Sequence, residues 1–239
     1  MKTTMIVGAG GGLGKALATR LGKDNKNNRV LAISRQPQPD LPASVEQFQI
    51  PEQDDSSIGG ICRQLVETVS HIDQFICCVG LLHEGELQPE KKLEHLNAEH
   101  LHRYFAVNSI IPALWLKHLP ALVDAKRSAV IAFLSARVGS ITDNRLGGWY
   151  GYRSSKAALN MLIKTAQVEY RRRCPGVALV SYHPGTVDTP LSAPFQDRVP
   201  AHKLFKKEEA AGYLLSQLEG LTSDQAPYYL DWQGKPIPW

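Results

Sequence analysis

Hydrophobic and polar residues alternate along this chain in two kinds of segment. Short apolar runs predict buried strands, and the longer mixed segments between them predict helices. The strands are expected at residues 3–7, 29–34, 45–50, 74–80, 130–135, 177–182 and 228–230. The helices are expected at residues 15–21, 54–70, 97–122 and 207–220, with a further one carrying Tyr152 and Lys156. This alternation predicts a parallel sheet of about seven strands, covered by helices on both faces.

The connections between these segments carry the sequence features that suggest function. Prolines keep residues 36–42 out of strands and helices, residues 81–92 form a long irregular connection, and residues 139–148 are rich in glycine. The proline-punctuated stretch 184–200, which includes Pro194, Phe195 and Arg198, is the expected substrate lid. These segments follow strands, where open α/β sheets bind ligands. No domain boundary is visible, so residues 1–239 are expected to form a single domain.

The first strand runs directly into a glycine turn, Gly8-x-x-x-Gly12-x-Gly14, and a helix opens at Lys15. Strand, glycine turn and helix together are typical of a dinucleotide-binding site. The glycines permit a tight turn and close approach of a pyrophosphate, and the helix start presents free N–H groups. This context favours such a site over an ordinary turn. The predicted fold class is therefore α/β, a Rossmann-type doubly wound parallel sheet.

Tyr152 and Lys156 lie four residues apart on a predicted helix, which places both side chains on one face. A nearby positive charge favours the phenolate, so we expect Lys156 to lower the pKa of Tyr152. Such a phenol is a proton donor or acceptor near neutral pH. Alone, this pair usually marks a solvated helix face. The glycine turn upstream is what favours a catalytic role for Tyr152 and Lys156 over a solvated helix face.

The end of the second strand predicts which dinucleotide is bound. An acidic residue about 20 positions after the glycine turn would hold the adenosine ribose of NAD(H). Ser34 and Arg35 stand there instead, and an arginine fork can pair with a 2′-phosphate. We therefore expect NADP(H) as the cofactor, the alternative being that Arg35 is an ordinary surface arginine.

Asn108 lies four residues before Pro112, which has no backbone N–H. The carbonyl of Asn108 therefore loses its usual helical partner, and a water molecule is the obvious replacement donor. A kinked helix without chemistry is the structural alternative.

Several stretches together resemble the short-chain dehydrogenase/reductase family over nearly the whole chain. They comprise the glycine turn, Val107-Asn108, Tyr152-x-x-x-Lys156 and the segment from Tyr182 to Thr189. The segments 137–144, 147–150, 152–160 and 231–239 are similar to the C-factor and Sniffer-type carbonyl reductase branch of that family.

The resemblance implies hydride transfer between the nicotinamide C4 and a small carbonyl or alcohol substrate. In that scheme Tyr152 exchanges the proton, Lys156 lowers the tyrosine pKa and binds the nicotinamide ribose, and a water on Asn108 extends the proton relay. The residues implied to bind the cofactor, besides Tyr152 and Lys156, are Gly8, Gly12, Leu13, Gly14, Ser34, Arg35, Gly80, Pro184, Gly185, Val187 and Thr189.

The chain departs from the family pattern at two places. Cys77-Cys78-Val79-Gly80 replaces a strand that usually reads Asn-Asn-Ala-Gly, which little affects cofactor binding. Ala136 occupies the position of the serine that holds the substrate oxygen. Ser135 and Ser140 are the possible substitutes, and the sequence does not decide between them.

Composition narrows the classes of protein. A hydrophobic content of 43%, a charged content of 21% and a net charge of +4 fit a globular protein that binds neither nucleic acid nor membrane. A first strand beginning at Thr3 leaves no room for a signal peptide, so the cysteines are expected as free thiols in the cytoplasm. Neither the cysteines nor the histidines at positions 95, 100 and 102 have convincing metal-site spacing, and no metal is expected.

Three functions remain at this stage. The leading one is an NADPH-dependent carbonyl reductase acting on a small ketone or aldehyde, as a homodimer or homotetramer. The alternative is an NADP(H)-binding regulatory or signalling protein with weak or no turnover, which Ala136 keeps open. An epimerase or dehydratase on a related fold is disfavoured, because the chain is short for a sugar-nucleotide domain.

Overall fold

The computed structural model describes residues 1–197 and 199–239, so Arg198 of the expected lid lies outside the described part of the chain. A parallel sheet of seven strands in the order β3-β2-β1-β4-β5-β6-β9 forms its centre. The strands are β1 Lys2–Val7, β2 Asn28–Ser34, β3 Val45–Gln49, β4 Gln74–Cys77, β5 Ala129–Leu134, β6 Val177–His183 and β9 Tyr228–Asp231. A small second sheet pairs β7 Thr186–Val187 with β8 Leu204–Phe205.

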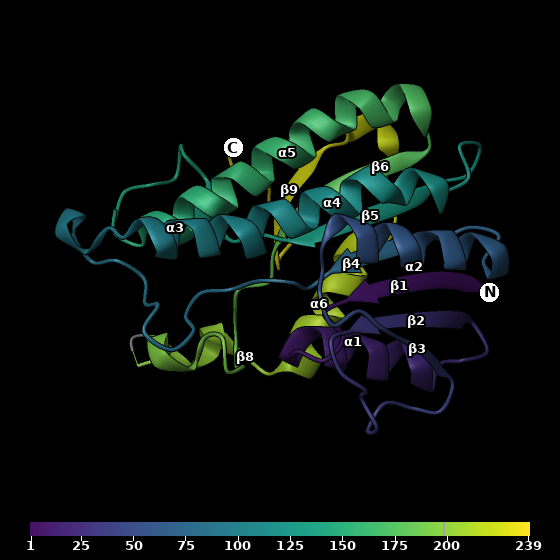
Figure 1. Ribbon diagram of the computed structural model, residues 1–239, viewed down its shortest axis with the longest axis horizontal. Coiled ribbons are helices and arrows are strands. Elements are labelled where there is room, and N and C mark those ends of the chain that lie inside the picture. The colour runs from purple at the N-terminus through teal and green to yellow at the C-terminus, as the bar shows by residue number, and fades with distance from the viewer. Residues whose placement is uncertain (198) are drawn as a thin grey trace.

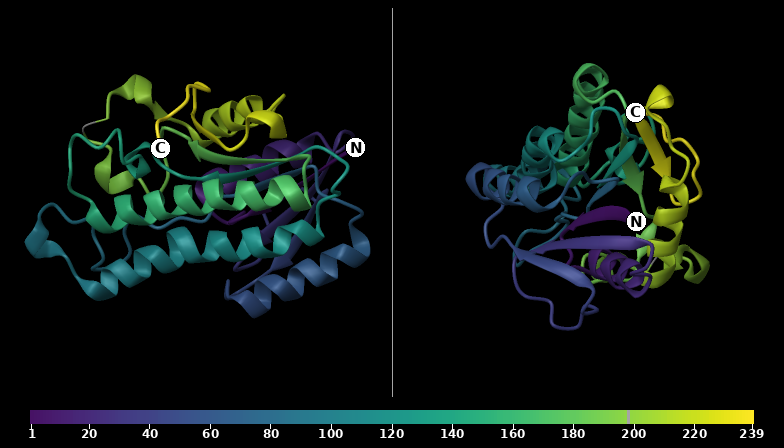
Figure 2. Two further views of the ribbon diagram at one scale, coloured as in Figure 1. Left: turned by 90° about the horizontal axis from the view of Figure 1, so that it is seen from above. Right: turned by 90° about the vertical axis from the view of Figure 1, so that its right-hand side faces the viewer.

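Helices cover both faces of the sheet, as Figures 1 and 2 show. They are α1 Gly12–Lys23, α2 Asp55–Thr68, α3 Ala98–Phe105, α4 Ile111–His118, α5 Tyr150–Arg173 and α6 Lys207–Leu218. Side chains of α2, α4 and α5 pack into one buried cluster with the sheet, and those of α1 and α6 into another on the opposite face. The predicted α/β fold with a doubly wound parallel sheet is confirmed.

The order in which strands are added to the sheet reverses at β1. Strands β2 and β3 lie on one side of β1, and β4 and the later strands lie on the other. Such a switch point leaves a crevice at the carboxyl ends of the two strands. Gly8 follows β1 at this place, and its amide donates to the carbonyl of Ile33 at 3.0 Å. The topology therefore puts the glycine turn at the ligand-binding edge.

The helix expected at residues 97–122 is interrupted. Between α3 and α4 the chain forms a π-helical turn, Ala106–Ile110, in which the amide of Ile111 donates to the carbonyl of Ala106. Pro112 follows at once and has no N–H to offer, so the regular α-helical ladder cannot pass through this point. Asn108 lies inside the π-helical turn and is fully buried.

Candidate active site

The glycine turn has a geometry that only glycine permits. Gly8 has a φ of +82°, and its carbonyl accepts from the amide of Gly11 at 3.0 Å. A Cβ on Gly14 would lie 2.3 Å from the carbonyl oxygen of Gly8, which real structures exclude. Helix α1 then starts without a side-chain cap and without an acidic residue in its first turn. Its first amides are therefore available to a phosphate, so the turn fits the pyrophosphate of a dinucleotide.

The segment 184–189 lies directly beside this turn. A Cβ on Gly12 would come within 2.4 Å of Cγ2 of Thr189. Gly185 has a φ of +76°, and a Cβ there would lie 2.6 Å from the Phe205 ring. Val187 is buried, and its carbonyl accepts from the Ser192 hydroxyl at 2.5 Å. The structure thus brings together two segments that are 170 residues apart in the sequence and that were both predicted to hold the cofactor.

Leu13 and Pro184, which were also predicted to bind the cofactor, differ in how far their side chains are buried. The Leu13 side chain is buried in the core cluster of α1 and α6, so only its backbone can face a ligand. Pro184 is partly buried at the end of β6.

Ser34 and Arg35 end β2 with opposite environments. Ser34 is buried, and its hydroxyl donates to the carbonyl of Gln36 at 2.6 Å. Arg35 is exposed, and within residues 1–197 and 199–239 no hydrogen bond or ion pair engages its guanidinium. Arg35 is therefore available to an external anion, while Ser34 shapes the turn that follows it.

Lys156, Asn108 and Gly80 meet beneath the predicted catalytic helix. Lys156 is only 2% exposed, and its ammonium donates to the carbonyl of Leu134 at 2.8 Å. A Cβ on Gly80 would lie 3.6 Å from Nζ of Lys156 and 3.7 Å from Oδ1 of Asn108. The Asn108 amide also bridges the backbone of Leu81 and the Ser155 hydroxyl of α5. Residues from three distant segments therefore form one buried polar cluster.

The pKa of Tyr152 is raised above its ordinary value, opposite to the lowering predicted from the sequence. The phenol is buried, which disfavours the phenolate, and the neighbouring Tyr229 adds to the effect. Lys156 does not reverse it, because Nζ lies 5.9 Å from the centre of the Tyr152 ring. Burial also lowers the pKa of Lys156 to about 8, so the compensating charge is itself weakened. The i, i+4 spacing correctly placed the two side chains together but did not predict how deeply they are buried.

The hydroxyls of Ser135 and Ser140 form hydrogen bonds with groups other than Tyr152. The Ser135 hydroxyl donates to Oδ1 of Asn160 at 2.7 Å. The Ser140 hydroxyl donates to the carbonyl of Pro238 at 2.5 Å and accepts from the Asp143 amide. Ala136 itself packs in one apolar cluster with Tyr152. The position expected to hold the substrate oxygen therefore carries a methyl group, and both candidate hydroxyls are engaged elsewhere.

Two residues that the sequence did not single out shape the turn that leads to Tyr152. Trp149 precedes α5 with a φ of +52°, a left-handed conformation that costs a bulky residue about 1–3 kcal/mol. Glu90, in the irregular connection after β4, accepts at its backbone carbonyl from Trp149 and at Oε2 from the amide of Gly151. Gly147-Gly148 before Trp149 was the only sequence signal for this turn. Nothing in the local sequence marks Glu90, which lies 61 residues from Gly151.

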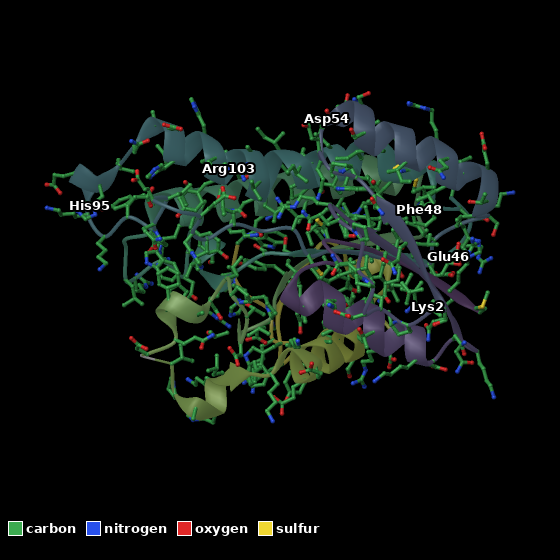
Figure 3. The ribbon with its side chains drawn as sticks, turned by 60° about the horizontal axis from the view of Figure 1, so that its bottom comes forward. Lys2, Glu46, Phe48, Asp54, His95 and Arg103 are labelled. Atoms are coloured by element: carbon green, nitrogen blue, oxygen red, sulfur yellow. The ribbon has the colours of Figure 1, made fainter. Side chains whose placement is uncertain are left out.

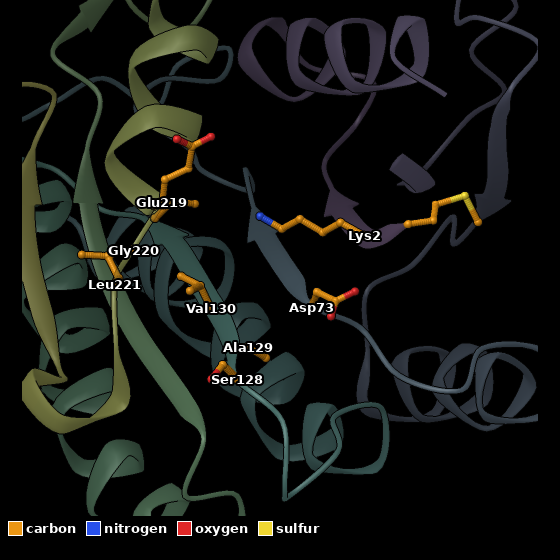
Figure 4. Close-up of a pocket in the computed structure, with 10 residues that line it drawn as sticks. Lys2, Asp73, Ser128, Ala129, Val130, Glu219, Gly220 and Leu221 are labelled. Atoms are coloured by element: carbon orange, nitrogen blue, oxygen red, sulfur yellow. The ribbon is translucent and has the colours of Figure 1, made fainter. Parts of the chain in front are cut away.

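The remaining features of the described chain suggest no competing site. The four cysteines are unpaired, no group of three or more candidate metal ligands occurs among the described residues, and no described helix is long and apolar enough to cross a membrane. Lys2, at the start of β1, and His95 lie at opposite ends of the molecule (Figure 3). A pocket lined by Lys2, Asp73 and Glu219 lies at the amino ends of β1 and β5 (Figure 4), whereas Tyr152 packs with Ala136, which follows the carboxyl end of β5.

Comparison with known proteins places the chain in a family. The sequence pattern described as short chain dehydrogenase matches residues 2–199. C-signal of Myxococcus xanthus is 31% identical over 140 residues, which cover 57% of this chain and 77% of that protein.

Solved structures share the fold along the whole chain. The carbonyl reductase Sniffer of D. melanogaster has a TM-score of 0.83 at 20% identity and covers 100% of both chains. The NADPH-bound carbonyl reductase from chicken fatty liver has a TM-score of 0.84 at 22% identity, covering 100% of this chain and 94% of the other. The resemblance found in the sequence is therefore confirmed: this chain belongs to the short-chain dehydrogenase family.

Proposed function

We propose that this protein is an NADPH-dependent carbonyl reductase acting on small ketones or aldehydes. The observation that carries the proposal is the buried cluster of Tyr152, Lys156 and Asn108, which borders Gly80 at the carboxyl edge of the sheet. The glycine turn and Thr189 meet at the same edge. A proton-transfer group therefore lies beside a cradle that fits a dinucleotide. The NADPH seen in the chicken carbonyl reductase agrees with the choice of cofactor.

Bound NADPH would supply the hydride, and the protein supplies position and protons. Tyr152 donates its proton to the substrate oxygen. Because burial raises its pKa, the phenol stays protonated throughout the physiological range, which suits reduction better than alcohol oxidation. Lys156 presents an ammonium below pH 8 and holds the ribose, while Asn108 fixes α5 against the end of β4.

Cofactor selection rests on Arg35. Its exposed guanidinium at the end of β2 can form paired hydrogen bonds with a 2′-phosphate. No carboxylate stands beside it at Ser34 or Gln36 to repel that phosphate or to hold the two ribose hydroxyls of NADH.

A second function is kept because of one observation. Ala136 gives no hydrogen bond to a substrate oxygen, and the Ser135 and Ser140 hydroxyls are bound to other groups. A protein that binds NADP(H) and signals its presence, with weak turnover, would tolerate this loss. The C-signal relative is consistent with this alternative.

The test is NADPH oxidation against a panel of aldehydes, ketones and quinones, with Tyr152→Phe as the variant. We expect the variant to bind NADPH with unchanged affinity and to lose about 10²–10⁴-fold in rate, because only the proton donor is removed. Tyr150→Phe, which lies two residues before Tyr152 on α5 and is only partly buried, is the matched control. A Tyr152→Phe enzyme with the wild-type rate would refute the proton-donor role. NADPH binding without turnover on any substrate would favour the regulatory alternative.

Three further expectations belong to this proposal. We expect one catalytic domain over residues 1–239 and a cytoplasmic location. We also expect a homodimer or homotetramer, for which the exposed apolar side chains of Ile110, Met161 and Val168 provide a surface. Light scattering on Met161→Lys and Val168→Lys variants tests that surface, since charges there should shift the protein to monomer.

A further inference from the structure

Aromatic side chains pack around Tyr152, and we call Tyr104, Trp149 and Phe195 the aromatic wall. The centroid of the Trp149 ring lies 6.1 Å from that of the Tyr152 ring and 5.1 Å from that of the Phe195 ring, and both pairs are edge to face. Tyr104 meets Tyr152 edge-on at 6.3 Å. These rings come from α3, from the turn before α5 and from the expected lid. Three segments distant in sequence therefore converge on the proton-donating group.

Trp149 and Phe195 are the exposed members of this wall. Both are partly exposed, whereas Tyr104 is fully buried and Tyr152 is 7% exposed. Trp149 and Phe195 are therefore the members of the wall that a ligand arriving from solvent can contact. The Phe195 and His83 rings also pack edge to face, with 5.8 Å between their centroids. This contact places the expected lid against the connection after β4.

The position of Trp149 is held by specific contacts rather than by local preference. Gly147 and Gly148 also have positive φ values, of 63° and 66°, so three successive residues adopt the left-handed conformation and turn the indole back onto Tyr152. Glu90 fixes this turn by accepting from the Trp149 and Gly151 amides at 2.5 and 3.0 Å. Strained backbone maintained by distant contacts is characteristic of functional sites.

The chemistry of the wall indicates what it would bind. Arg153 is engaged with the carbonyls of Gly148 and Val138, and Arg103 is paired with Glu84. The Tyr104 hydroxyl donates to the carbonyl of Leu82. Among the described residues, the wall thus offers ring faces and edges but no free cation for a carboxylate or phosphate group.

Resting on the proposed function, we propose that Trp149 and Phe195 form a subsite for a flat aromatic ring that carries no acidic group and is attached to the substrate carbonyl. The edge-to-face contact between the two side chains is replaced by contacts of the same kind with the substrate ring. Saturated rings of equal size lack the flat face and the positive ring edge on which these contacts depend. The subsite therefore selects aryl ketones over their saturated counterparts.

The test uses acetophenone and cyclohexyl methyl ketone, which have the same carbon skeleton and differ in the flatness and aromaticity of the ring. We expect kcat/KM to favour acetophenone by about tenfold, since each aromatic contact contributes a factor of roughly two to ten. Trp149→Gly should remove most of that preference, because it should lower kcat/KM more for acetophenone than for cyclohexyl methyl ketone. Glycine adopts a positive φ without strain, so this variant keeps the turn.

Phe195→Leu provides a second variant on the other side of the subsite, with the same expected loss of preference. Tyr213→Leu is the matched control, because Tyr213 lies on α6 and belongs to a different aromatic group with Phe205 of β8 and Trp232. Tyr213→Leu should keep the wild-type preference. Equal kcat/KM for the two ketones in the wild type, or a preference that survives in both variants, would overturn the proposal.

Binding separates this proposal from the proposed function. Dissociation constants for both ketones are measured by ligand-observed NMR, with and without NADP⁺. Tighter binding of acetophenone that is lost in Trp149→Gly supports the subsite, even if no carbonyl is turned over and the reductase proposal fails. Turnover of both ketones without any difference in binding or rate would retain the reductase and eliminate the subsite.

Discussion

Restoring a hydroxyl at position 136 tests how this site stabilises the substrate oxygen. Ala136 is 8% exposed and packs in the same apolar cluster as Tyr152. In Ala136→Ser, one hydroxyl is added in that cluster and no other group is moved. Tyr229, whose hydroxyl donates to the Ala136 carbonyl at 2.6 Å, holds the backbone in place. The substitution therefore adds a donor beside the phenol with little disturbance of the loop.

The expected gain in rate follows from the cost of losing such a donor. Removing one hydrogen bond to a developing oxyanion lowers kcat by about 10²–10³-fold in other enzymes. Here the new hydroxyl can accept from the Gly139 amide, which now donates to the Ala136 carbonyl at 2.8 Å, and still donate its own proton to the substrate oxygen. We therefore expect a rise in kcat of about 10- to 100-fold, with NADPH affinity unchanged.

The same hydroxyl should lower stability in the absence of substrate. A buried hydroxyl without a partner costs roughly 1–3 kcal/mol. For a chain of this size, 1 kcal/mol shifts Tm by about 2–4 °C, so Tm should fall by about 2–12 °C. A smaller decrease in Tm would mean that the hydroxyl accepts from the Gly139 amide, and the gain in rate should remain because the hydroxyl proton is still free to be donated.

The assay compares steady-state reduction of one ketone by the wild type and by Ala136→Ser, together with thermal melts. Ser140→Ala is the control, and it should reduce stability rather than rate because its hydroxyl ties the loop to Pro238. A fast wild type that Ala136→Ser leaves unchanged and Ser140→Ala disables would refute the reasoning, since Ser140 would then hold the substrate oxygen.

The remaining predictions concern the cofactor cradle and the buried lysine. Arg35→Ala should remove most of the preference for NADPH over NADH, and Ser34→Asp should move it toward NADH; equal wild-type affinities, measured by fluorescence titration, would contradict this. Gly12→Ala should weaken NADPH binding, because its Cβ would lie 2.4 Å from Cγ2 of Thr189, whereas Gly60→Ala, in open space on α2, should not. The pKa of Lys156 is lowered from 10.5 to about 8, so NADPH affinity should fall by up to tenfold per pH unit above about 8 in the wild type but not in Lys156→Arg. The unfolded chain binds the Lys156 proton more tightly than the folded chain does. This group alone should therefore raise the free energy of unfolding of the cofactor-free protein as pH rises from about 8 to 10.5. A pH dependence of Tm that is the same in Lys156→Met across that window would count against the assigned burial.

The sequence determined the features that depend on local spacing. Alternating apolar and amphipathic segments can bury their apolar sides only by forming a parallel sheet between helix layers. The spacing Gly8-x-x-x-Gly12-x-Gly14 follows a strand and opens a helix, which is enough to identify the phosphate-binding turn. Helical geometry alone places Tyr152 and Lys156 on one face, and Pro112 alone predicts that the carbonyl of Asn108 loses its usual helical partner.

Only the tertiary structure decided features that depend on burial and on contacts between distant segments. The pKa of Tyr152 is raised rather than lowered, because packing from several elements removes water that the helix alone would leave in place. Ser135 and Ser140 are directed away from the site by Asn160 and by the carboxyl-terminal segment, which no local pattern reveals. Glu90 reaches Gly151 across 61 residues, and the left-handed turn at Trp149 depends on that contact. Spacing in the sequence fixes which groups can share a face, whereas the solvation and direction of each group are set by the neighbours that folding brings to it.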